Sequence, residues 1–444
     1  MKKLSKRSRG LILFGIALGC FALLGFVSQI TAPLTQNFDK ALFIDSLHSV
    51  DLRPNLYAIL TVMTLPAALL ARYFGIRACL LMGMCLFSGG ALSTLPAAQV
   101  GTAGPLAIGI TFIYSGLAFI DTAAMTMMVT YGERQKSYGR ILVGKTFEMA
   151  GWAVGLCATT FIFSPRSITP EMGSGTLSES LFAEAAQRAD LMTAATPFIW
   201  VGAVACVMVF ISALQEANDS TPDPALKYKL VGIAKKLSKD KTYLFGAAAL
   251  AVYLMTQVFC WHNIVGLSTA AEMSEAGDTP PHKASGHATD MILLTLLFFC
   301  IVRLIVIPYA YRKKNNPRKL LLWVCCAASA LTLASAFAPC NVGKWLVVLA
   351  TTAMSLIFPT IVELMTRHLD RETAVVAMPL AVMSNFGGLL AWLVNKLVDP
   401  DSPLIMVISA VTLAGIAAYA VWLDKNKPKP ARNSDFYKTP TSDD

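Results

Sequence analysis

The stretch GPLAIGITFIYSGLAFIDTAAMTMMVTYGERQKSYGRILVGKTFEMAGWAVGLCATTFIF, residues 104–163, decides the fold. It holds two apolar runs, each long enough to cross a bilayer as a helix, joined by a charged turn at about 132–138. Asp121 lies deep in the first run and Glu148 deep in the second. Each is about ten residues from the turn, so at about 1.5 Å per residue both lie roughly 14–16 Å from one membrane face.

These two carboxylates are costly in lipid. A buried ionised carboxylate costs at least a few kcal/mol there, so two at one depth indicate a water-filled or protein-lined cavity. We predict that Asp121 and Glu148 couple transport to protons. Lys145 precedes Glu148 by three residues on the same helix and could pair with it, leaving Asp121 as the titrating group. The alternative is that both carboxylates belong to a structural charge network.

The composition is that of an all-α polytopic membrane protein. Of 444 residues, 55% are apolar and only 14% are charged, far less charge than in a soluble protein of this length. The pattern predicts about twelve transmembrane helices in two six-helix bundles. The span at 76–97 is the least certain of these predictions, because the turn before it is very short. The predicted spans are 11–31, 54–73, 76–97, 104–131, 139–163, 192–214, 242–266, 288–311, 319–338, 343–367, 373–397 and 403–423.

The net charge of +10 follows the membrane topology. With the N-terminus inside, 29 of the 37 Lys and Arg fall on the cytoplasmic side, which predicts cytoplasmic termini and a multi-pass protein of the cytoplasmic (inner) membrane. The basic excess faces the inner leaflet of the lipid bilayer, and nucleic acid is not implied. The first apolar run is longer than a usual signal-peptide core, so we expect it to be an uncleaved helix.

The domain prediction follows from one linker. Residues 1–214 form an N-terminal six-helix bundle, and 242–423 form a C-terminal one. Between them, 215–241 is a cytoplasmic linker whose apolar positions recur at helical spacing with lysines between them. Residues 424–444 are expected to be a disordered cytoplasmic tail, and we expect a monomer.

The seventh span contains TQVFCWHNIVG, which combines an aromatic face with hydrogen-bonding groups. Rings beside amides suit sugars, whose C–H faces stack on rings while their hydroxyls take hydrogen bonds. The alternative is an interfacial aromatic belt. The predicted substrate-binding residues are Gln29, Tyr114, Trp152, Gln257, Trp261, His262, Asn263 and Asn385.

Gating residues are expected near the cytoplasmic face. Arg303, inside the eighth span, and Glu363, in the tenth, could form an inner gate that opens during the cycle, with Lys145 as a third member. A permanent structural pair is the alternative, and Arg303 could also snorkel to the interface.

Several other functions find no support. No G-x-S-x-G, H-E-x-x-H or nucleotide-binding glycine loop occurs, so we predict no enzyme and no cofactor beyond protons as coupling ion. His282 and His287 have acidic neighbours, but their spacing fits no standard metal site, and we expect solvated loop residues. The cysteines lie almost all within spans and are read as packing residues.

Four segments carry a resemblance to a known family: GLAFIDTAA (116–124), KTFEMAG (145–151), the pair Cys260–Trp261, and AMSLIFPTI (353–361) followed by HLDRET. Taken together, they resemble the fucose permease family, the fucose/galactose/proton symporter branch of the major facilitator superfamily. The likeness is distant but extends over nearly the whole chain.

The resemblance implies roles for three residues. Asp121 takes the position of the proton-coupling glutamate of the family, Glu148 that of a neutral amide that contacts sugar, and Trp261 that of the stacking aromatic. Two positions depart from the family: Ala32 stands where a second acidic residue is expected, and Phe358 replaces a tyrosine before Pro-Thr-Ile. Both departures weaken any assignment of fucose as the substrate.

The leading hypothesis is a proton-coupled secondary transporter that moves a small polar solute, with a monosaccharide as the best guess, by alternating access. An exporter or importer of another small metabolite on the same fold, such as an amino acid, organic acid or chelator, is the main alternative. A membrane sensor without transport is a remote one.

Overall fold

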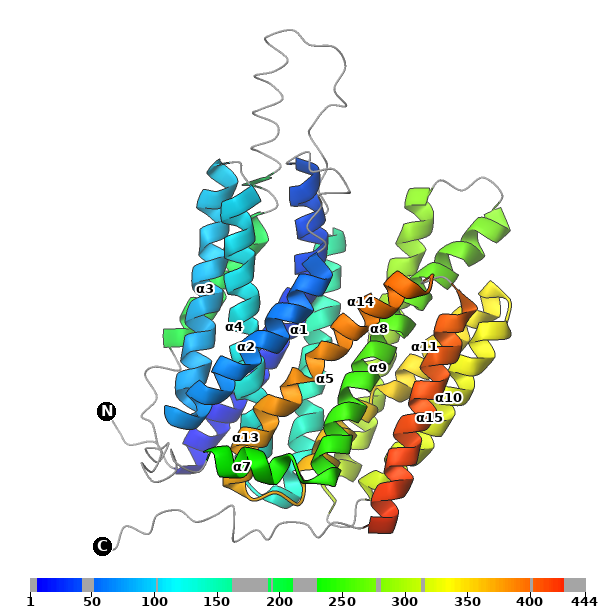
Figure 1. Ribbon diagram of the computed structural model, residues 1–444. Helices are drawn as coiled ribbons and strands as arrows, with labels where there is room; N and C mark the ends of the chain where they lie inside the picture. The colour runs from blue at the N-terminus through cyan, green and yellow to red at the C-terminus, as the bar shows by residue number, and fades with distance from the viewer. Residues whose placement is uncertain are drawn as a thin grey trace, which may run out of the picture. The chain divides into compact units, whose positions relative to one another are not determined.

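The computed structural model describes residues 6–41, 52–100, 103–161, 191–192, 195–210, 230–276, 281–312, 316–399 and 402–426 (Figure 1). Within these ranges the chain is helical apart from short turns. Among these residues, ten helical stretches are long and apolar enough to cross a membrane, and Phe14–Ile30 and Ala195–Phe210 are shorter apolar helical stretches. Residues 162–190 and most of the tail lie outside the described residues.

The first half begins with five long helices. They are α1 (Lys6–Ala41), α2 (Leu52–Tyr73), α3 (Ile76–Val100), α4 (Ala103–Thr130) and α5 (Ser137–Phe161). The uncertain span at 76–97 is confirmed as a helix, and the turn before it is short because Gly75 adopts a positive φ of 95°. Pro33 lies within α1, which continues to Ala41.

The second half begins with a short helix, α7 (Leu230–Leu237), in the predicted linker. Ile233 and Leu237 are buried and their helix packs on α13, whereas Lys235 and Lys236 are exposed, so the amphipathic pattern here is confirmed. The helices that follow are α8 (Lys241–Ala276), α9 (Pro281–Ala310), α10 (Pro317–Phe337), α11 (Cys340–Met354), α12 (Ile357–Thr366), α13 (Arg371–Val382), α14 (Phe386–Leu397) and α15 (Pro403–Asn426).

Two predicted spans are broken near their middles. The span at 343–367 is divided into α11 and α12 by a turn at Ser355 and Leu356. The span at 373–397 is divided into α13 and α14 by the 3₁₀ helix η3 (Met383–Asn385). Broken helices free backbone polar groups, which are tolerated at membrane depth only where protein or water satisfies them.

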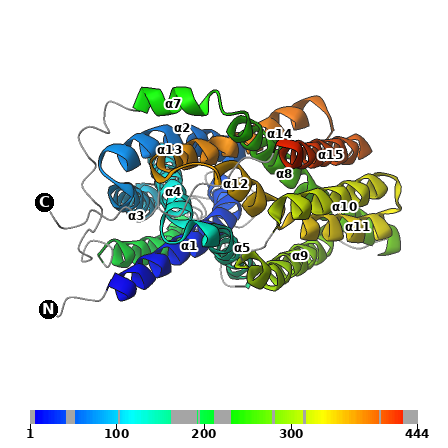
Figure 2. The ribbon, with the colours of Figure 1, turned by 90° about the horizontal axis from the view of Figure 1, so that it is seen from below.

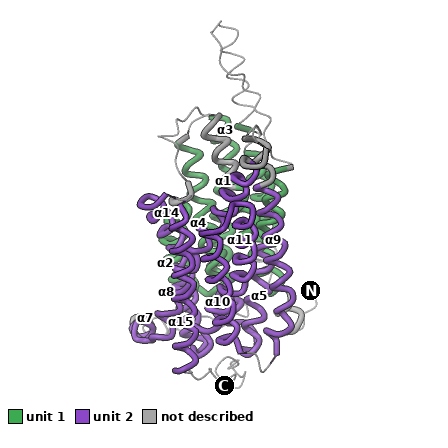
Figure 3. The backbone as a smooth tube through the Cα atoms, turned by 90° about the vertical axis from the view of Figure 1, so that its right-hand side faces the viewer, with its two compact units in different colours: residues 1–124, 150–222 green, residues 125–149, 223–444 purple. Residues whose placement is uncertain are grey.

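The chain divides into two compact units, which Figure 3 colours separately. The first unit comprises residues 1–124 and 150–222, and the second comprises 125–149 and 223–444. The turn between α4 and α5, with the adjoining ends of both helices, therefore groups with the second half of the sequence, and α4 and α5 each contribute to both units.

Each unit has its own helix packing. In the first unit, Gly90 lets α3 and α4 approach closely, because glycine has no Cβ. A Cβ at this position would lie only 2.7 Å from the carbonyl oxygen of Gly109. In the second, α8 is central and packs against α9, α11, α12, α14 and α15, while α10 lies between α11 and α15 (Figure 2).

Candidate functional site

The second unit contains an ion pair on α5 that the sequence spacing predicts. The Nζ of Lys145 lies 2.5 Å from Oε2 of Glu148, one helical turn later. The two side chains are only 9% and 18% exposed. A pair this shielded is screened little by salt, so its attraction exceeds that of a surface pair.

Aromatic rings lie beside this ion pair. The Nζ of Lys145 is 4.6 Å from the ring centre of Phe358, the second residue of α12, which makes a cation–π contact. The ring of Tyr253, on α8, lies 6.2 Å from that of Phe358, and its hydroxyl donates a 3.1 Å hydrogen bond to the carbonyl of Met354. A charged pair against rings can bind a polar solute that also has apolar faces.

Arg303, on α9, joins α5 to the break between α11 and α12. Its Nε donates a 2.9 Å hydrogen bond to the carbonyl of Ser355, and its Nη1 donates one to the carbonyl of Lys145. The carbonyl of Ser355 has no helical donor four residues later, because that residue is Pro359, which lacks an N–H. The buried guanidinium therefore supplies the hydrogen bond that the proline removes.

Arg303 also connects the ion pair to a predicted aromatic residue. Its guanidinium lies 4.7 Å from the ring centre of Phe299, whose ring centre is 6.1 Å from that of Trp261. Trp261, Phe299 and Arg303 thus form a continuous set of contacts between α8 and α9. Of the predicted residues, the structure brings Lys145, Glu148, Arg303 and Trp261 into this one region, which we call the Lys145 site.

In this structure Arg303 and Glu363 have other partners than each other. Glu363 instead accepts a 2.5 Å hydrogen bond from Oγ of Ser137, and its carboxylate lies 3.7 Å from Arg134 and 3.8 Å from Arg367. The Nε and Nη1 of Arg303 donate to backbone carbonyls. The gating role of each residue stays a prediction.

The Glu363 cluster fixes the α4–α5 hairpin to α12. Arg134 donates to Oγ of Ser137 at 2.8 Å and to Oγ1 of Thr366 at 3.1 Å. One turn further on, the hydroxyls of Tyr138 and Thr360 are 2.9 Å apart. Arg134 and Glu363 are each only 2% exposed, so the cluster is a buried, hydrogen-bonded charge network. Tyr138 also belongs to a buried apolar cluster with Leu142, Ala310 and Leu356.

The other predicted residues of the second unit show different environments. Asn263 is buried and donates a 3.1 Å hydrogen bond to the carbonyl of Phe259 within α8. Gln257 and Asn385 are half-buried, and His262 is exposed. Asn385 lies at the end of η3, next to the break between α13 and α14. None of these contacts tests a role in solute binding.

Four predicted residues belong to the first unit. Tyr114 is buried, while Gln29, Asp121 and Trp152 are half-buried. Because Asp121 lies in the first unit and Glu148 in the second, their predicted approach across a cavity stays a prediction.

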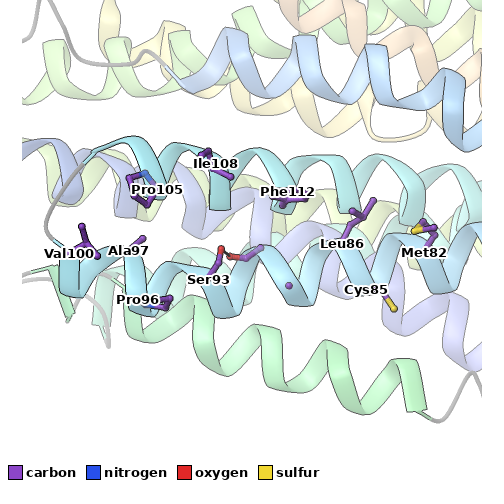
Figure 4. Close-up of a pocket in the computed structure, with 12 residues that line it drawn as sticks. Met82, Cys85, Leu86, Ser93, Pro96, Ala97, Val100, Pro105, Ile108 and Phe112 are labelled. Carbon is purple, nitrogen blue, oxygen red and sulfur yellow. Dashed lines mark hydrogen bonds between the residues drawn. The ribbon is translucent and has the colours of Figure 1, made fainter.

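A pocket of about 620 Å³ lies between α3 and α4 in the first unit (Figure 4). Its lining is almost entirely apolar, and the Ser93 hydroxyl donates back to the carbonyl of Gly90 at 2.7 Å. Sugar sites need several polar groups pointing inward, so this pocket does not fit a sugar.

Metal binding finds no support in the described part of the chain, where no group of three His, Cys, Asp or Glu side chains is placed to hold an ion. His282 and His287, which we expected in a loop, fall within α9 because that helix begins at Pro281.

Sequence reasoning missed the partners of the predicted residues. Arg134, Ser137 and Tyr138 fall in the predicted charged turn, and all three are buried. Tyr253 and Phe299 lie within apolar runs, where the sequence alone does not distinguish them from other membrane-facing or core residues. Pro359 was the one available signal, because a proline inside a predicted span leaves a carbonyl that needs another donor.

Comparison with known proteins adds to this geometry. No family model matches the chain. The L-fucose-proton symporter of Haemophilus influenzae is 24% identical over 408 residues, which cover 91% of this chain and 92% of the relative. The L-fucose-proton symporter of Escherichia coli is 22% identical over 384 residues, which cover 83% of this chain and 82% of the relative. Both are named as symporters, in agreement with the prediction that the chain is not an enzyme.

Solved structures agree in fold. The major facilitator superfamily transporter FucP, in the outward conformation, matches with a TM-score of 0.77 and 22% identity over 93% of this chain and 99% of that chain. The proton:xylose symporter XylE, bound to 6-bromo-6-deoxy-D-glucose, matches with a TM-score of 0.61 and 11% identity. The match covers 95% of this chain and 96% of that chain. The chain therefore has the fold of major facilitator superfamily transporters and is similar, over most of its length, to L-fucose-proton symporters.

Proposed function

We propose that the chain is a proton-coupled secondary transporter that moves a monosaccharide across the cytoplasmic membrane by alternating access. The observation that carries this proposal is the Lys145–Glu148 pair, a charged pair with low exposure on a membrane-spanning helix. Intramembrane ionisable residues mark solute and proton pathways. The curated relatives that the chain resembles over most of its length are named as proton symporters of a monosaccharide.

Glu148 and Asp121 carry the proton in this proposal. Lys145 is the ion-pair partner of Glu148, at 2.5 Å. Protonation of Glu148 breaks the ion pair and leaves the ammonium on Phe358. A change of charge at the site thus alters contacts between α5 and α12, which is what coupling requires.

The Glu363 cluster is the inner gate in this proposal. It lies at the turn between α4 and α5, on the side that the distribution of Lys and Arg assigns to the cytoplasm, with both termini on that side. Its contacts join residues more than two hundred positions apart in the chain. Opening to the cytoplasm therefore requires these hydrogen bonds to separate, while the linker at 215–241 lets two bundles, 1–214 and 242–423, move.

The solute binds near the Lys145 site. Trp261 and Phe358 supply ring faces, and Gln257 and Asn385 supply amide groups from elements of the same unit. Gln29, Tyr114, Trp152, His262 and Asn263 stay predicted solute-binding residues.

A zwitterionic or anionic metabolite is the second candidate, favoured by one observation. The Lys145–Glu148 pair offers both signs of charge, which suits an amino acid or organic acid better than a neutral sugar.

The test is uptake into proteoliposomes with an imposed pH gradient, inside alkaline, with radiolabelled L-fucose, D-galactose, D-xylose, amino acids and organic acids supplied one at a time. We expect accumulation of at least one monosaccharide that collapses with a protonophore. Accumulation of amino or organic acids alone would favour the second candidate, and the absence of any proton-driven uptake would contradict the proposal.

A further inference from the structure

The start of α8 and the end of α15 are fixed to each other within the second unit (Figure 2). The hydroxyl of Tyr419, on α15, donates a 3.0 Å hydrogen bond to the carbonyl of Thr242, near the start of α8. Three residues further along each helix, the rings of Phe245 and Trp422 make an edge contact with their centres 5.1 Å apart. The distribution of Lys and Arg assigns this end of the helices to the cytoplasm, so the ring pair lies close to the inner boundary between membrane and water.

Each of these two helices carries an exposed stripe of mostly apolar residues that ends in a lysine. Exposed positions at helical spacing near the start of α8 are Lys241, Leu244, Phe245 and Ala248. The corresponding exposed positions of α15 are Val411, Ala414, Ala418, Val421 and Lys425. Each ring of the Phe245–Trp422 contact is one turn from the lysine of its own helix, so the contact places the two stripes side by side.

The aspartate that precedes each lysine is engaged by another cation or histidine. The carboxylate of Asp240 lies 2.5 Å from Nε2 of His368, and that of Asp424 lies 3.9 Å from Arg318 on α10. Within the described part of the chain, neither lysine of the two stripes makes a salt bridge. The two ammonium groups therefore leave an excess of positive charge beside the exposed rings.

We propose that these ends of α8 and α15 bind an anionic phospholipid. The phosphate lies at the ammonium groups of Lys241 and Lys425, which we call the Lys241 site, and an acyl chain lies along the two apolar stripes. Lysines at the inner leaflet attract anionic lipids, and aromatic rings pack well at the level of the headgroups. The Lys241 site shares no residue with the Lys145 site, and it does not depend on the proposed function.

The combination of charge and apolar surface selects this occupant over two others. A zwitterionic phospholipid brings its own cation, which the two lysines repel. A free anion such as glycerol 3-phosphate meets the lysines but leaves the exposed rings and the apolar stripes without a partner. An anionic phospholipid matches both parts of the site.

The experiment titrates the purified, delipidated full-length chain in detergent with phosphatidylglycerol, or with phosphatidylcholine that has the same acyl chains. Bound lipids are counted by native mass spectrometry. We expect the wild type to bind phosphatidylglycerol more tightly than phosphatidylcholine, and glycerol 3-phosphate to displace neither. We expect Lys241→Gln/Lys425→Gln to bind phosphatidylglycerol about thirtyfold more weakly, because each lysine near an anionic lipid surface contributes to binding.

The matched control is Lys136→Gln/Lys235→Gln, which removes the same charge from two exposed positions in the α4–α5 turn and in α7. This variant should bind phosphatidylglycerol as the wild type does. Equal binding of the two lipids by the wild type would overturn the proposal, as would displacement by glycerol 3-phosphate. Unchanged binding by Lys241→Gln/Lys425→Gln, or equal weakening by the control, would overturn it too. If the double variant does not fold, the two single variants decide.

Discussion

The ammonium of Lys145 lies 2.5 Å from the carboxylate of Glu148, one turn apart on α5. A pair of this kind is neutral as a whole, which lowers the cost of holding each charge inside a membrane protein. It becomes a net positive charge when Glu148 is protonated. Binding of one proton to Glu148 therefore changes the net charge of the Lys145–Glu148 pair from zero to +1 inside the membrane-spanning part of the protein.

Glu148→Gln tests the role of this change directly in transport. The variant keeps the size of the side chain but cannot exchange a proton, so we expect pH-driven accumulation to be lost while exchange of labelled for unlabelled solute continues. Glu133→Gln is the control, because Glu133 pairs with Lys136 on the surface of the turn, at 2.9 Å, with both side chains about half exposed. Equal accumulation by Glu148→Gln and Glu133→Gln would exclude Glu148 from coupling.

Glu363→Ala should be strongly destabilising. The carboxylate is 3% exposed and accepts from Ser137 while facing Arg134 and Arg367, so its removal leaves buried positive charge without a counter-charge. Loss of one partner from a buried pair costs about 3–5 kcal/mol. Thermal unfolding measures the loss, and Glu372→Ala, at an exposed position of α13, should change the free energy of unfolding by less than about 0.5 kcal/mol. Similar melting temperatures for the two variants would contradict a role for Glu363 in stability.

Gly90→Ala and Gly89→Ala form a matched pair on α3. A Cβ on Gly90 would lie 2.7 Å from the carbonyl oxygen of Gly109 and from the backbone nitrogen of Ile113, whereas a Cβ on Gly89 meets nothing within 4 Å. Overpacking costs about 1–3 kcal/mol, so we expect Gly90→Ala to lower the melting temperature. Gly89→Ala should be neutral or slightly stabilising, since alanine favours a helix. The account of α3–α4 packing is wrong if both variants melt alike.

Asp370, which lies outside the membrane spans, should make the stability of the fold depend on pH. Burial raises the pKa of this carboxyl, but hydrogen bonds from the hydroxyl of Thr373 at 2.7 Å and from its N–H at 3.2 Å, with Lys236 at 3.4 Å, outweigh it. The pKa is thus held below its ordinary value of 3.8. A lowered folded pKa means that the stabilisation is complete above the ordinary value and is lost as the pH falls through the folded one.

We therefore expect Asp370→Asn to melt below the wild type at neutral pH, with the difference disappearing under acid conditions. Asp290→Asn, at an exposed site in α9, is the control and should show no such trend. A difference for Asp370→Asn that stays constant with pH would mean that the charge of Asp370 does not stabilise the fold.

Much of the local structure follows from the sequence. The charged turn between two apolar runs predicted the α4–α5 hairpin, and the three-residue spacing predicted the Lys145–Glu148 pair, since residues one turn apart meet on a helix surface. The amphipathic pattern predicted α7 for the same reason. Such features depend on contacts within a few residues.

The partners of Arg303 and Glu363 depend on distant segments. Nothing near Glu363 in the sequence indicates Ser137, which lies 226 positions earlier. The pairing of Arg303 with Glu363 was inferred from membrane depth, but depth leaves the rotational position of each helix open. Backbone carbonyls also compete for an arginine, and here the carbonyl freed by Pro359 takes one of its donors.

Proton movement during solute entry tests the central claim most directly. L-fucose, D-galactose or D-xylose is added to de-energised proteoliposomes, and the external pH is recorded with the wild type, Asp121→Asn and Glu148→Gln. We predict that the external medium becomes more alkaline as a monosaccharide enters through the wild type, and that the variants abolish or reduce this change. Entry of a monosaccharide through the wild type with no change in external pH would contradict it.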